Sequence, residues 1–507
     1  MLFKISTASL IGIDANLVEV EVDISKGLPG FSMVGLPDAS VKESKERVRA
    51  ALRNCGYIFP SRKITINLAP ADQKKEGAAF DLPISLGFLA YLGLFPLENL
   101  KDFLFLGELA LDGKLKQVKG SLSVAVLAER LAFKGMVLPR CNAKEACLVK
   151  DLEIYGLDNI SQVVRFLKNP SQERPCECSP AEGMNKPEEG MDFKEIRGQQ
   201  HVKRALEVAT AGGHNILMIG PPGAGKTMLA KRLPTILPPL SYKEMITVTK
   251  IYSAMGLLMR HGVVKERPFR APHHTITDAG LIGGGVIPKP GEVTLAHQGV
   301  LFLDELPEFR KSVLEDLRQP LENGYVVISR VSMSIVFPSS FMLVGAMNPF
   351  EDSCRIGSEE RAGGTSLRKR HYYSRLSGPL LDRIDIQVDV PKLEFRDIVS
   401  KREGESSYMI RRRVLRACEE QKKRFQGRIY SSNHLMNAED IRNYCKIDCT
   451  SKRLMETAVD RFGLSMRAYT RILKVARTIA DLMEEKEVRS VHISEAIQYR
   501  VLDKYMP

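Results

Sequence analysis

A glycine-rich loop between an apolar run and a helical pattern constrains this sequence more than any other feature. Residues 215–227 read NILMIGPPGAGKT. The apolar run 216–219 predicts a buried strand, and apolar residues at 228, 229 and 233 give the next segment a helical apolar face. Gly220, Gly223 and Gly225 permit a tight turn whose backbone N–H groups point inward. A strand, loop and helix of this kind can cradle the phosphates of a nucleotide.

The positions of this loop have separate expected roles. The predicted nucleotide-binding residues are Gly220, Pro221, Pro222, Gly223, Ala224, Gly225, Lys226 and Thr227. Lys226 would reach the β- and γ-phosphates, and Thr227 would place its hydroxyl on Mg²⁺. The motif G-x-x-x-x-G-K-[ST] also occurs by chance in long chains. The prediction of a nucleotide site therefore rests on the strand and the helix that flank the loop. We expect an enzyme that uses ATP and Mg²⁺.

The chain of 507 residues is too long for one core, and its pattern changes along its length. We predict an α+β domain over residues 1–168, a linker over 169–190, a parallel α/β core over 191–394 and a helical lid over 395–507. The linker is rich in proline, glycine, serine and acidic residues and cannot bury enough apolar surface to fold alone.

The first domain begins with an alternating strand that contains Val18, Val20, Val22 and Ile24, and a second strand covers residues 64–68. Between them, Asp38 is expected to cap a helix that stops at Gly56. The N-terminus lacks the pattern of a signal peptide, and the uncharged run 331–350 reads as two strands and a turn. Nine cysteines without a framework spacing suit a reducing compartment, so we expect a cytoplasmic protein without a membrane span.

The core continues with GVLFL (299–303) and FMLVGAM (341–347), two apolar runs typical of strands buried on both faces. IDIQVDV (384–390) alternates and predicts a strand with one wetter face. Strands separated by helical stretches indicate a parallel, helix-flanked sheet. Beyond residue 394 the pattern is helical, with Asn437 and Ser465 as N-caps, Gly463 as a stop and Ser494 opening the last helix.

Polar residues follow the core strands where ligands bind in open α/β sheets. Asp304 and Glu305 come directly after GVLFL, which is the Walker B arrangement. Asp304 would hold Mg²⁺ and Glu305 would activate the attacking water. The alternative is that both residues belong to a solvated acidic turn without a catalytic role. Asn348 could orient that water or be an ordinary turn residue. Arg383 and Arg467, taken alone, read as surface ion-pair partners.

The order GPPGAGKT, LFLDE, VGAMNP, LLDRID and LSMRAYTRILKVARTIADL resembles AAA+ ATPases of the magnesium-chelatase-like clade. RPFRAPHHT, GLIGGGVIPKPGEVTLAHQGVLFLDELPEF and SGPLLDRIDI resemble its ComM (YifB) family more closely. The resemblance implies that Asn348 is sensor 1, Arg467 is sensor 2, and Arg383 is the arginine finger of a homohexameric ring. Arg375 is a rival for the finger.

The N-terminal segment INLAPADQKKEGAAFDLPISLG also looks like the first domain of that family, which is similar to the Lon protease (S5-type) domain. That chemistry needs a serine nucleophile and a lysine base. Ala79 and Leu122 stand at the positions that we align with them. Without either group no acyl-enzyme can form, so we expect no peptidase activity.

The loops after the core strands hold further candidates. ComM-like chains often carry a cysteine cluster after the sensor asparagine, but here only Cys354 lies near, and one thiol cannot make a four-ligand zinc site. His273 and His274 would point to opposite sides of an extended strand, which disfavours a metal site. The resemblance places them at the start of an insertion that continues to Lys289, and Arg330 lies near the turn of a second hairpin. In related motors such hairpins line the pore.

Two functions remain open. The resemblance implies a DNA-translocating motor of the helicase or branch-migration type, used in natural transformation or recombination. A net charge of +13 and ten basic residues between 401 and 428 favour DNA as its partner. Single-stranded or branched DNA would then contact Arg330 and Lys289. A solvated helix face explains the basic cluster equally well. The alternative is a motor that remodels a protein partner, as magnesium chelatase motor subunits do.

Overall fold

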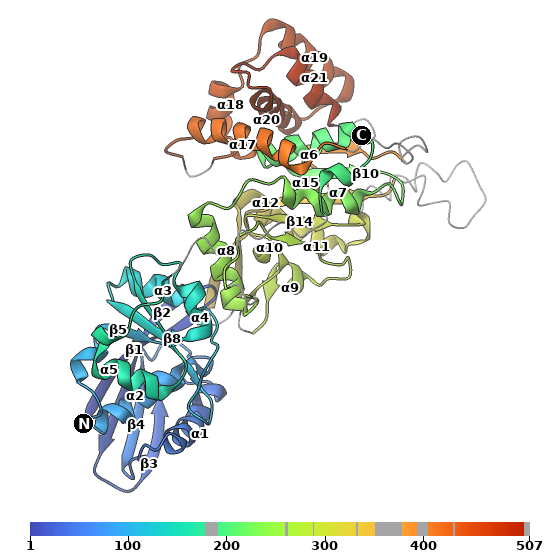
Figure 1. The fold of residues 1–507 in the computed structure, drawn as a ribbon. Coiled ribbons are helices and arrows are strands. Elements are labelled where there is room, and N and C mark those ends of the chain that lie inside the picture. Colours follow the sequence, from blue (N-terminus) through green and yellow to red (C-terminus); the bar gives the residue numbers. More distant parts are fainter. Residues whose placement is uncertain are drawn as a thin grey trace. The chain divides into compact units, whose positions relative to one another are not determined.

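The computed structural model describes residues 1–177, 191–258, 262–286, 288–330, 333–349, 378–392, 404–428 and 431–500. The chain divides into two compact units, Met1–Glu182 with Ser241–Lys265 and Gly183–Leu240 with Glu266–Pro507 (Figure 1). Residues 241–265, which the sequence places within the ATPase core, therefore belong to the first unit.

Four strands form the larger sheet of the first unit, in the order β1-β2-β4-β3. They span Leu2–Ile11 (β1), Asp14–Ser25 (β2), Gly30–Val34 (β3) and Lys63–Ala69 (β4). β2 pairs antiparallel with β1 and β4, whereas β3 runs parallel to β4. Buried side chains alternate along β2 and β4, so both predicted strands are confirmed.

Helix α1 (Ala39–Asn54) begins and ends where the sequence predicts. Oδ1 of Asp38 accepts a hydrogen bond of 2.8 Å from the backbone N–H of Val41 and so satisfies a free donor of the first turn. The chain leaves the helix through Gly56, whose φ of +81° favours glycine.

A second, parallel sheet in the order β5-β8-β9 completes the first unit with its flanking helices. The elements are α2 (Asp81–Tyr91), β5 (Phe103–Phe105), β6 (Glu108–Leu109), β7 (Leu115–Lys116), α3 (Ser121–Arg130), β8 (Gly135–Pro139), α4 (Arg140–Ala146), β9 (Glu153–Leu157) and α5 (Ile160–Lys168). β6 and β7 form a separate antiparallel pair. The domain is thus mixed α and β, as expected.

Helix α8 (Tyr242–Met255) is built into this first unit. Nζ of Lys250 lies 2.6 Å from Oδ1 of Asp14, and the backbone N–H of Gly120 donates to the carbonyl of Ser253 over 3.1 Å. Ile246 packs against the hydrophobic cluster that contains Leu122. A helix that follows the phosphate loop in sequence therefore covers apolar surface of the N-terminal domain.

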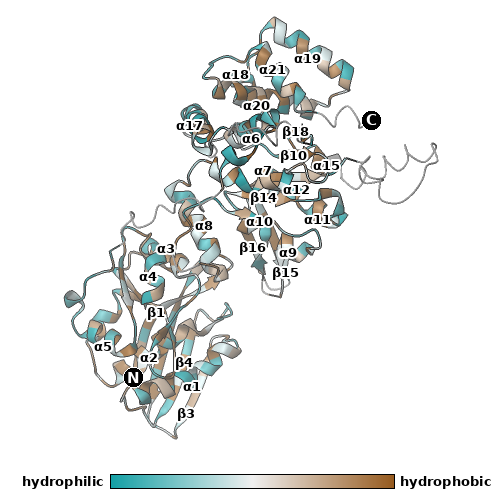
Figure 2. Cartoon of the chain, turned by 45° about the vertical axis from the view of Figure 1, so that its right-hand side comes forward, coloured by the Kyte–Doolittle hydropathy of each residue, from teal (hydrophilic) through white to brown (hydrophobic). Residues whose placement is uncertain are grey.

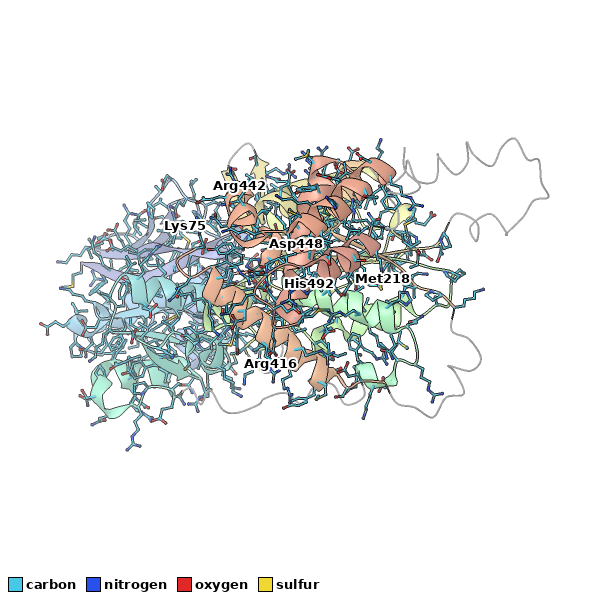
Figure 3. The ribbon with its side chains drawn as sticks, turned by 90° about the horizontal axis from the view of Figure 1, so that it is seen from above. Lys75, Met218, Arg416, Arg442, Asp448 and His492 are labelled. Carbon is cyan, nitrogen blue, oxygen red and sulfur yellow. The ribbon has the colours of Figure 1, made fainter. Side chains whose placement is uncertain are left out.

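The second unit is organised around a five-stranded parallel sheet in the order β11-β14-β17-β10-β18. The strands span Phe269–Arg270 (β11), Val300–Leu303 (β14), Met342–Met347 (β17), Ile216–Ile219 (β10) and Ile386–Asp389 (β18). β10, β14 and β17 are buried throughout, and Met218 of β10 is labelled in Figure 3. The predicted parallel core is confirmed.

Helices and two hairpins precede or connect these strands. They are α6 (Gln200–Gly212), α7 (Lys226–Arg232), α9 (Asp278–Leu281), β12 (Gly283–Gly284), β13 (Lys289–Pro290), α10 (Glu292–Leu295), α11 (Lys311–Asp316), α12 (Arg318–Asn323), β15 (Tyr325–Arg330), β16 (Met333–Pro338) and α15 (Gly378–Leu381). β15 and β16 pair antiparallel, as predicted from YVVISRVSMSIVF. Short 3-10 helices across the chain span Ala78–Phe80, Leu97–Leu100, Pro170–Gln172, Phe193–Glu195, Leu233–Thr235, Leu306–Glu308 and Asn433–Leu435.

The last strand of the sheet corrects one expectation. The alternation in 384–390 predicted a wetter face, but Asp385 and Gln387 are buried and only Asp389 is exposed. Asp385 keeps its charge inside because its carboxylate faces His214 and Arg471, at 3.3 and 3.6 Å. The polar residues of this strand thus have partners inside the protein, not water.

The C-terminal part is helical, as predicted. It comprises α17 (Ser407–Arg424), α18 (Ala438–Tyr444), α19 (Cys449–Phe462), α20 (Met466–Leu482) and α21 (Ser490–Gln498). Teal and brown turns adjoin on α19 in Figure 2, as expected of an amphipathic helix. Asn437 and Ser465 are N-caps, and Gly463 ends α19 with a φ of +62°.

Ser494 does not open the last helix. α21 begins one turn earlier, after Arg489, and Ser494 lies inside it. Nδ1 of His492 accepts a hydrogen bond of 3.0 Å from the backbone N–H of Arg489 and so closes the first turn. Histidine is an uncommon capping partner, which is why the sequence pointed to the serine instead.

Candidate functional site

The glycine-rich loop joins β10, which lies between β17 and β18 in the sheet, to the first turn of α7. Gly223 and Gly225 have φ of +78° and +89°, a backbone conformation that other residues rarely adopt. Gly220 is needed for a different reason, because a Cβ there would lie 2.1 Å from the carbonyl oxygen of Val390. The loop is therefore shaped by its glycines at both ends.

Lys226 and Asn348 come together beside this loop. Nζ of Lys226 donates to the carbonyls of Gly220 and Pro221, over 2.5 and 3.0 Å, and to Oδ1 of Asn348 over 3.0 Å. Lys226 is largely buried, so these oxygens replace the water that an ammonium group would otherwise bind. The ends of β10 and β17 thus meet, as the order of the strands requires.

Thr227 and Asp304 form a second pair of predicted site residues. The Thr227 hydroxyl donates to Oδ2 of Asp304 over 2.6 Å, and Oδ1 of Asp304 accepts from the backbone N–H of Glu305 over 3.0 Å. A hydroxyl and a carboxylate side by side are the hard oxygen ligands that Mg²⁺ prefers, so these residues fit the ion.

Glu305 has a contact that the sequence did not predict. Its Oε2 lies 3.4 Å from Nδ1 of His274, and its backbone φ is +52°, which is uncommon outside glycine. Its side chain remains about half exposed. A histidine in the loop after β11 therefore meets the residue that we expect to act as general base.

The prediction that His273 and His274 point to opposite sides is wrong. Both lie in the loop after β11, where the chain turns, and their ring centroids are 4.1 Å apart. Among the residues that the structure describes, no group of three or more histidine, cysteine or acidic side chains could hold a metal ion. Cys354 and the rest of the loop after Asn348 fall outside the described residues.

Arg383 and Arg467 lie in a separate cluster at the edge of β18. Arg383 is nearly buried and forms an ion pair with Glu322. Burial and the nearby Arg318, Arg467 and Arg471 lower the pKa of Arg383. Arg467 is exposed and lies 3.5 Å from Oδ2 of Asp382. The rival Arg375 lies outside the described residues.

The backbone around Arg383 is held from three sides. Nδ2 of Asn215 donates to the Arg383 carbonyl over 3.0 Å, and Arg471 and Arg500 both donate to the carbonyl of Ile384, over 3.1 and 2.9 Å. The loop that carries Arg383 is thus fixed to β10 and α20, a contact that no local sequence signal could have revealed.

The two predicted hairpins touch each other. Nε of Arg330, at the end of β15, donates to the carbonyl of Gly285 in the turn between β12 and β13, over 3.1 Å. Arg330 and Lys289 are both exposed. The two candidate DNA residues therefore belong to one pair of adjoining hairpins.

Four of the seven basic residues of helix α17 form ion pairs with acidic side chains. Arg413 pairs with Glu207 and Glu405, and Arg416, labelled in Figure 3, lies 2.8 Å from Glu484. Lys423 pairs with Glu420 and Arg424 with Asp481. Lys401 and Arg402 lie outside the described residues. This favours the structural explanation of the cluster over a DNA-binding one.

Ala79 and Leu122, the positions aligned with a nucleophile and a base, belong to one hydrophobic cluster of the first unit. Leu122 is fully buried, on the first turn of α3. Apolar side chains therefore occupy both positions at which this chemistry needs a serine and a lysine.

Three family models match successive parts of the chain. Residues 192–398 match magnesium chelatase, subunit ChlI, residues 20–142 match subunit ChlI of Mg-chelatase, and residues 404–500 match the C-terminal part of that subunit. The competence protein ComM of Haemophilus influenzae is 44% identical over 501 residues, which cover 98% of this chain and 97% of ComM. This chain belongs to the ComM (YifB) family of magnesium-chelatase-like AAA+ ATPases.

Other relatives match either nearly the whole chain or only part of it. The YifB protein of Salmonella typhimurium is 42% identical over 505 residues, covering 99% of this chain and 97% of YifB. The magnesium-chelatase 67 kDa subunit of Chlorobaculum parvum is 26% identical over only 179 residues, 34% of this chain and 25% of the subunit. Within the described ranges, no helix is long and apolar enough to cross a membrane.

Proposed function

We propose that this ComM-family chain is a cytoplasmic, ATP-driven motor that acts on DNA as a homohexameric ring. Its activity would be of the helicase or branch-migration type, in natural transformation or recombination. The observation that carries the proposal is the contact between Arg330 and the Gly285 turn, because it joins two hairpins of the second unit that each carry one exposed basic residue, Arg330 and Lys289. The 44% identity to a competence protein supports the same direction.

The proposed hydrolysis uses the residues gathered at the ends of the strands. The phosphates of ATP would lie on residues Gly220 to Thr227, with Lys226 on the β- and γ-phosphates. Thr227 and Asp304 would hold Mg²⁺, which when bound neutralises charge on the phosphate oxygens. Glu305 takes a proton from water while the water oxygen bonds to the γ-phosphorus, and the bond to the bridging oxygen breaks to leave ADP and phosphate.

The remaining site residues complete this proposal. Asn348 would orient the attacking water, and Arg467 would sense the nucleotide from α20. Arg383 would stabilise charge on the γ-phosphoryl group of a neighbouring subunit. Its fixed backbone supports this, because Asn215 holds the Arg383 carbonyl just before β10, at the opposite end of that strand from the glycine-rich loop.

DNA would bind through phosphate contacts of Arg330 and Lys289. Such contacts carry no sequence information, so the motor would recognise the backbone and shape of single-stranded or branched DNA. The N-terminal domain, proposed to be Lon-like over residues 1–168, would bind a partner or stabilise the assembly. The place of Ala79 and Leu122 in one hydrophobic cluster supports the absence of peptidase chemistry.

A second candidate is the remodelling of a protein partner. The pairing of Arg413 and Arg416 of α17 with acidic side chains supports it, because paired arginines are less available to the phosphates of DNA. The partial similarity to a magnesium-chelatase subunit points the same way.

The deciding experiment supplies forked and four-way DNA, with Mg²⁺ and ATP, to the wild-type protein. We expect strand separation or branch movement that Lys226→Ala abolishes. If wild type leaves both substrates intact, and DNA does not raise its ATP turnover, the protein-partner function replaces this proposal.

A further inference from the structure

Strand β3 lies at one edge of the larger sheet of the first unit (Figure 1). It runs parallel to β4 on one side, and no strand among the described residues pairs with its other side. The backbone N–H of Gly30 donates to the carbonyl of Arg62 over 3.3 Å, so residues 30, 32 and 34 face β4. The N–H and C=O groups of Phe31 and Met33 therefore point to the open side of the sheet.

This edge lacks the features that usually prevent a sheet edge from pairing with another chain. Such edges are commonly blocked by a charged side chain, a proline or a bulge on the strand itself. The strand reads GFSMV, without charge or proline, and its register with β4 is continuous. Each of its residues is at least partly exposed. The backbone groups on the open side are thus accessible to another segment.

Large apolar side chains lie beside the same edge. Leu28, in the turn before β3, is 90% exposed, and Ile58, between α1 and β4, is 78% exposed. Phe59, next to Ile58, packs against Phe88, which also contacts Phe31 of β3. Exposed apolar side chains that gather in one place are typical of a binding surface.

Two cations of α1 border the aromatic residues of this edge. Nζ of Lys45 lies 5.5 Å from the ring centroid of Phe31, and the guanidinium carbon of Arg49 lies 5.7 Å from that of Phe59. Lys45 also has Glu46 at 3.7 Å, whereas no acidic side chain within the described ranges forms an ion pair with Arg49. Arg49 therefore keeps an unbalanced positive charge next to the edge.

Further cations lie where β3 begins. Lys63 is the register partner of Gly30, and Arg62 precedes it in the chain. Both are exposed, and in the part of the chain that the structure describes neither forms an ion pair. A second copy of β3 would bring the same cations together, which disfavours pairing between two copies. A partner with negative charge would instead balance them.

We propose that the β3 edge binds an extended, acidic peptide segment of a partner protein. Its backbone would pair with the open N–H and C=O groups of Phe31 and Met33, so that it adds a strand to the sheet. Its carboxylates would meet the cations on both sides, and its apolar side chains would cover Leu28 and Ile58. A nucleic acid could meet the cations, but it has no alternating N–H and C=O groups for the strand. The proposal goes beyond the motor activity, because binding at β3 requires neither ATP nor DNA.

The test uses the full chain without nucleotide. The probe is a fluorescein-labelled dodecapeptide of alternating glutamate and valine, and fluorescence anisotropy measures its dissociation constant. We expect saturable binding, which a dodecapeptide of alternating lysine and valine should not show. Absence of saturable binding by the acidic peptide overturns the inference.

Met33→Pro tests the backbone contact. It removes an N–H group that points away from β4, and proline is tolerated on the solvent side of an edge strand. Met33→Ala is the matched control, because it loses the same side chain but keeps the N–H group. Met33→Pro should bind the peptide about fivefold more weakly than Met33→Ala, as expected from the loss of one hydrogen bond. Equal dissociation constants contradict the proposed strand pairing.

Replacing both Arg62 and Lys63 by glutamate tests the charge, and it does not depend on how well the proline variant folds. Peptide binding should weaken about tenfold, because two favourable charge pairs become unfavourable. Arg442→Glu changes an exposed arginine of the second unit and should leave binding unchanged. If the double variant and Arg442→Glu bind the peptide equally, the inference fails.

Two further outcomes would assign the edge to a different occupant and so overturn the proposal. In one, oligothymidylate competes with the peptide and binds Met33→Pro and Met33→Ala equally, which indicates a nucleic-acid surface. In the other, sedimentation velocity shows a wild-type assembly that both Met33→Pro and the peptide dissociate, which indicates a second copy of the chain. Absence of DNA-stimulated ATP turnover would contradict the proposed motor function, yet it would leave peptide binding at β3 unaffected.

Discussion

Lys226 and Asn348 are 122 positions apart in the sequence, yet Nζ of one lies 3.0 Å from Oδ1 of the other. The contact exists because β10 and β17 are neighbours in a parallel sheet, so the loops that follow them emerge at the same edge. When a nucleotide binds, a phosphate oxygen can replace Oδ1 of Asn348 as a partner of the Lys226 ammonium group.

Replacing Lys226 and Glu305 should give two different phenotypes. Lys226→Ala should weaken ATP binding and abolish hydrolysis, because the cation that meets the phosphates is lost. Glu305→Gln should bind ATP and lose turnover by about a hundredfold or more, because only the base is removed. Equilibrium binding of a fluorescent ATP analogue and steady-state phosphate release distinguish them. Normal turnover by Glu305→Gln contradicts its role as base.

Arg383→Ala should bind ATP normally and lose hydrolysis by about a hundredfold, as expected when a group that stabilises transition-state charge is removed. Mixing it with Lys226→Ala should restore part of the activity, since one subunit then supplies an intact loop and its neighbour an intact arginine. Phosphate release measured across mixing ratios checks this.

Glu322→Gln is the matched control for the finger. It removes the ion-pair partner of Arg383 and leaves the guanidinium in place. Turnover should be equal to or above wild type if Arg383 acts on a neighbour. If mixtures of Arg383→Ala and Lys226→Ala form mixed rings but recover no activity, Arg383 acts within its own subunit or only in folding.

The stability of the second unit should fall between neutral and mildly acidic pH. Burial, and the neighbouring His214, lower the pKa of His434 to about 4. The unfolded chain, with an ordinary histidine pKa near 6.5, then binds a proton that the folded chain refuses. The contribution of His434 to the free energy of unfolding is therefore fully present above about pH 6.5. It decreases as pH falls toward about 4, by at most about 3 kcal/mol.

Urea unfolding at several pH values checks this prediction. His434→Gln should flatten the slope between pH 6.5 and 4.5. It should not remove the slope completely, because burial also lowers the pKa of His492. Asp385, whose pKa is lowered by the His214 and Arg471 that face it despite its burial, loses its contribution only at more acidic pH. An identical slope in wild type and His434→Gln contradicts the prediction.

Local patterns predicted the elements of this protein better than they predicted its contacts. Three elements depend only on neighbouring residues, and each was predicted. They are the strand β10 before the glycine-rich loop, the helix capped by Asp38 and the hairpin β15–β16. The pairing of Glu305 with His274 and the burial of Asp385 depend on residues distant in sequence, which periodicity does not report. Helix α8 is the largest such case, since its amphipathic pattern does not tell which domain it covers.

The placement of α8 predicts that the N-terminal domain needs this helix. A fragment of residues 1–177 alone should expose the apolar surface against which Ile246 packs, and should bind a hydrophobic dye. Adding a peptide of residues 241–265 should reduce dye binding and raise the melting temperature. A peptide with Ile246→Asp serves as the control, and equal effects of the two peptides contradict the prediction.

The last prediction concerns how DNA is held. If Arg330 and Lys289 contact phosphates, binding should weaken steeply with salt, by a slope of log affinity against log salt of about 0.9 for each phosphate neutralised on duplex DNA and about 0.7 on single strands. Arg330→Ala should lower that slope by about one such contact and weaken all sequences equally. Arg442→Ala, an exposed arginine of α18 labelled in Figure 3, is the matched control and should leave the slope unchanged. Binding of single-stranded and branched DNA at three salt concentrations, with a non-hydrolysable ATP analogue, measures the slope. Weak, salt-independent binding in every case would favour a protein partner, because phosphate contacts cannot be made without releasing counterions.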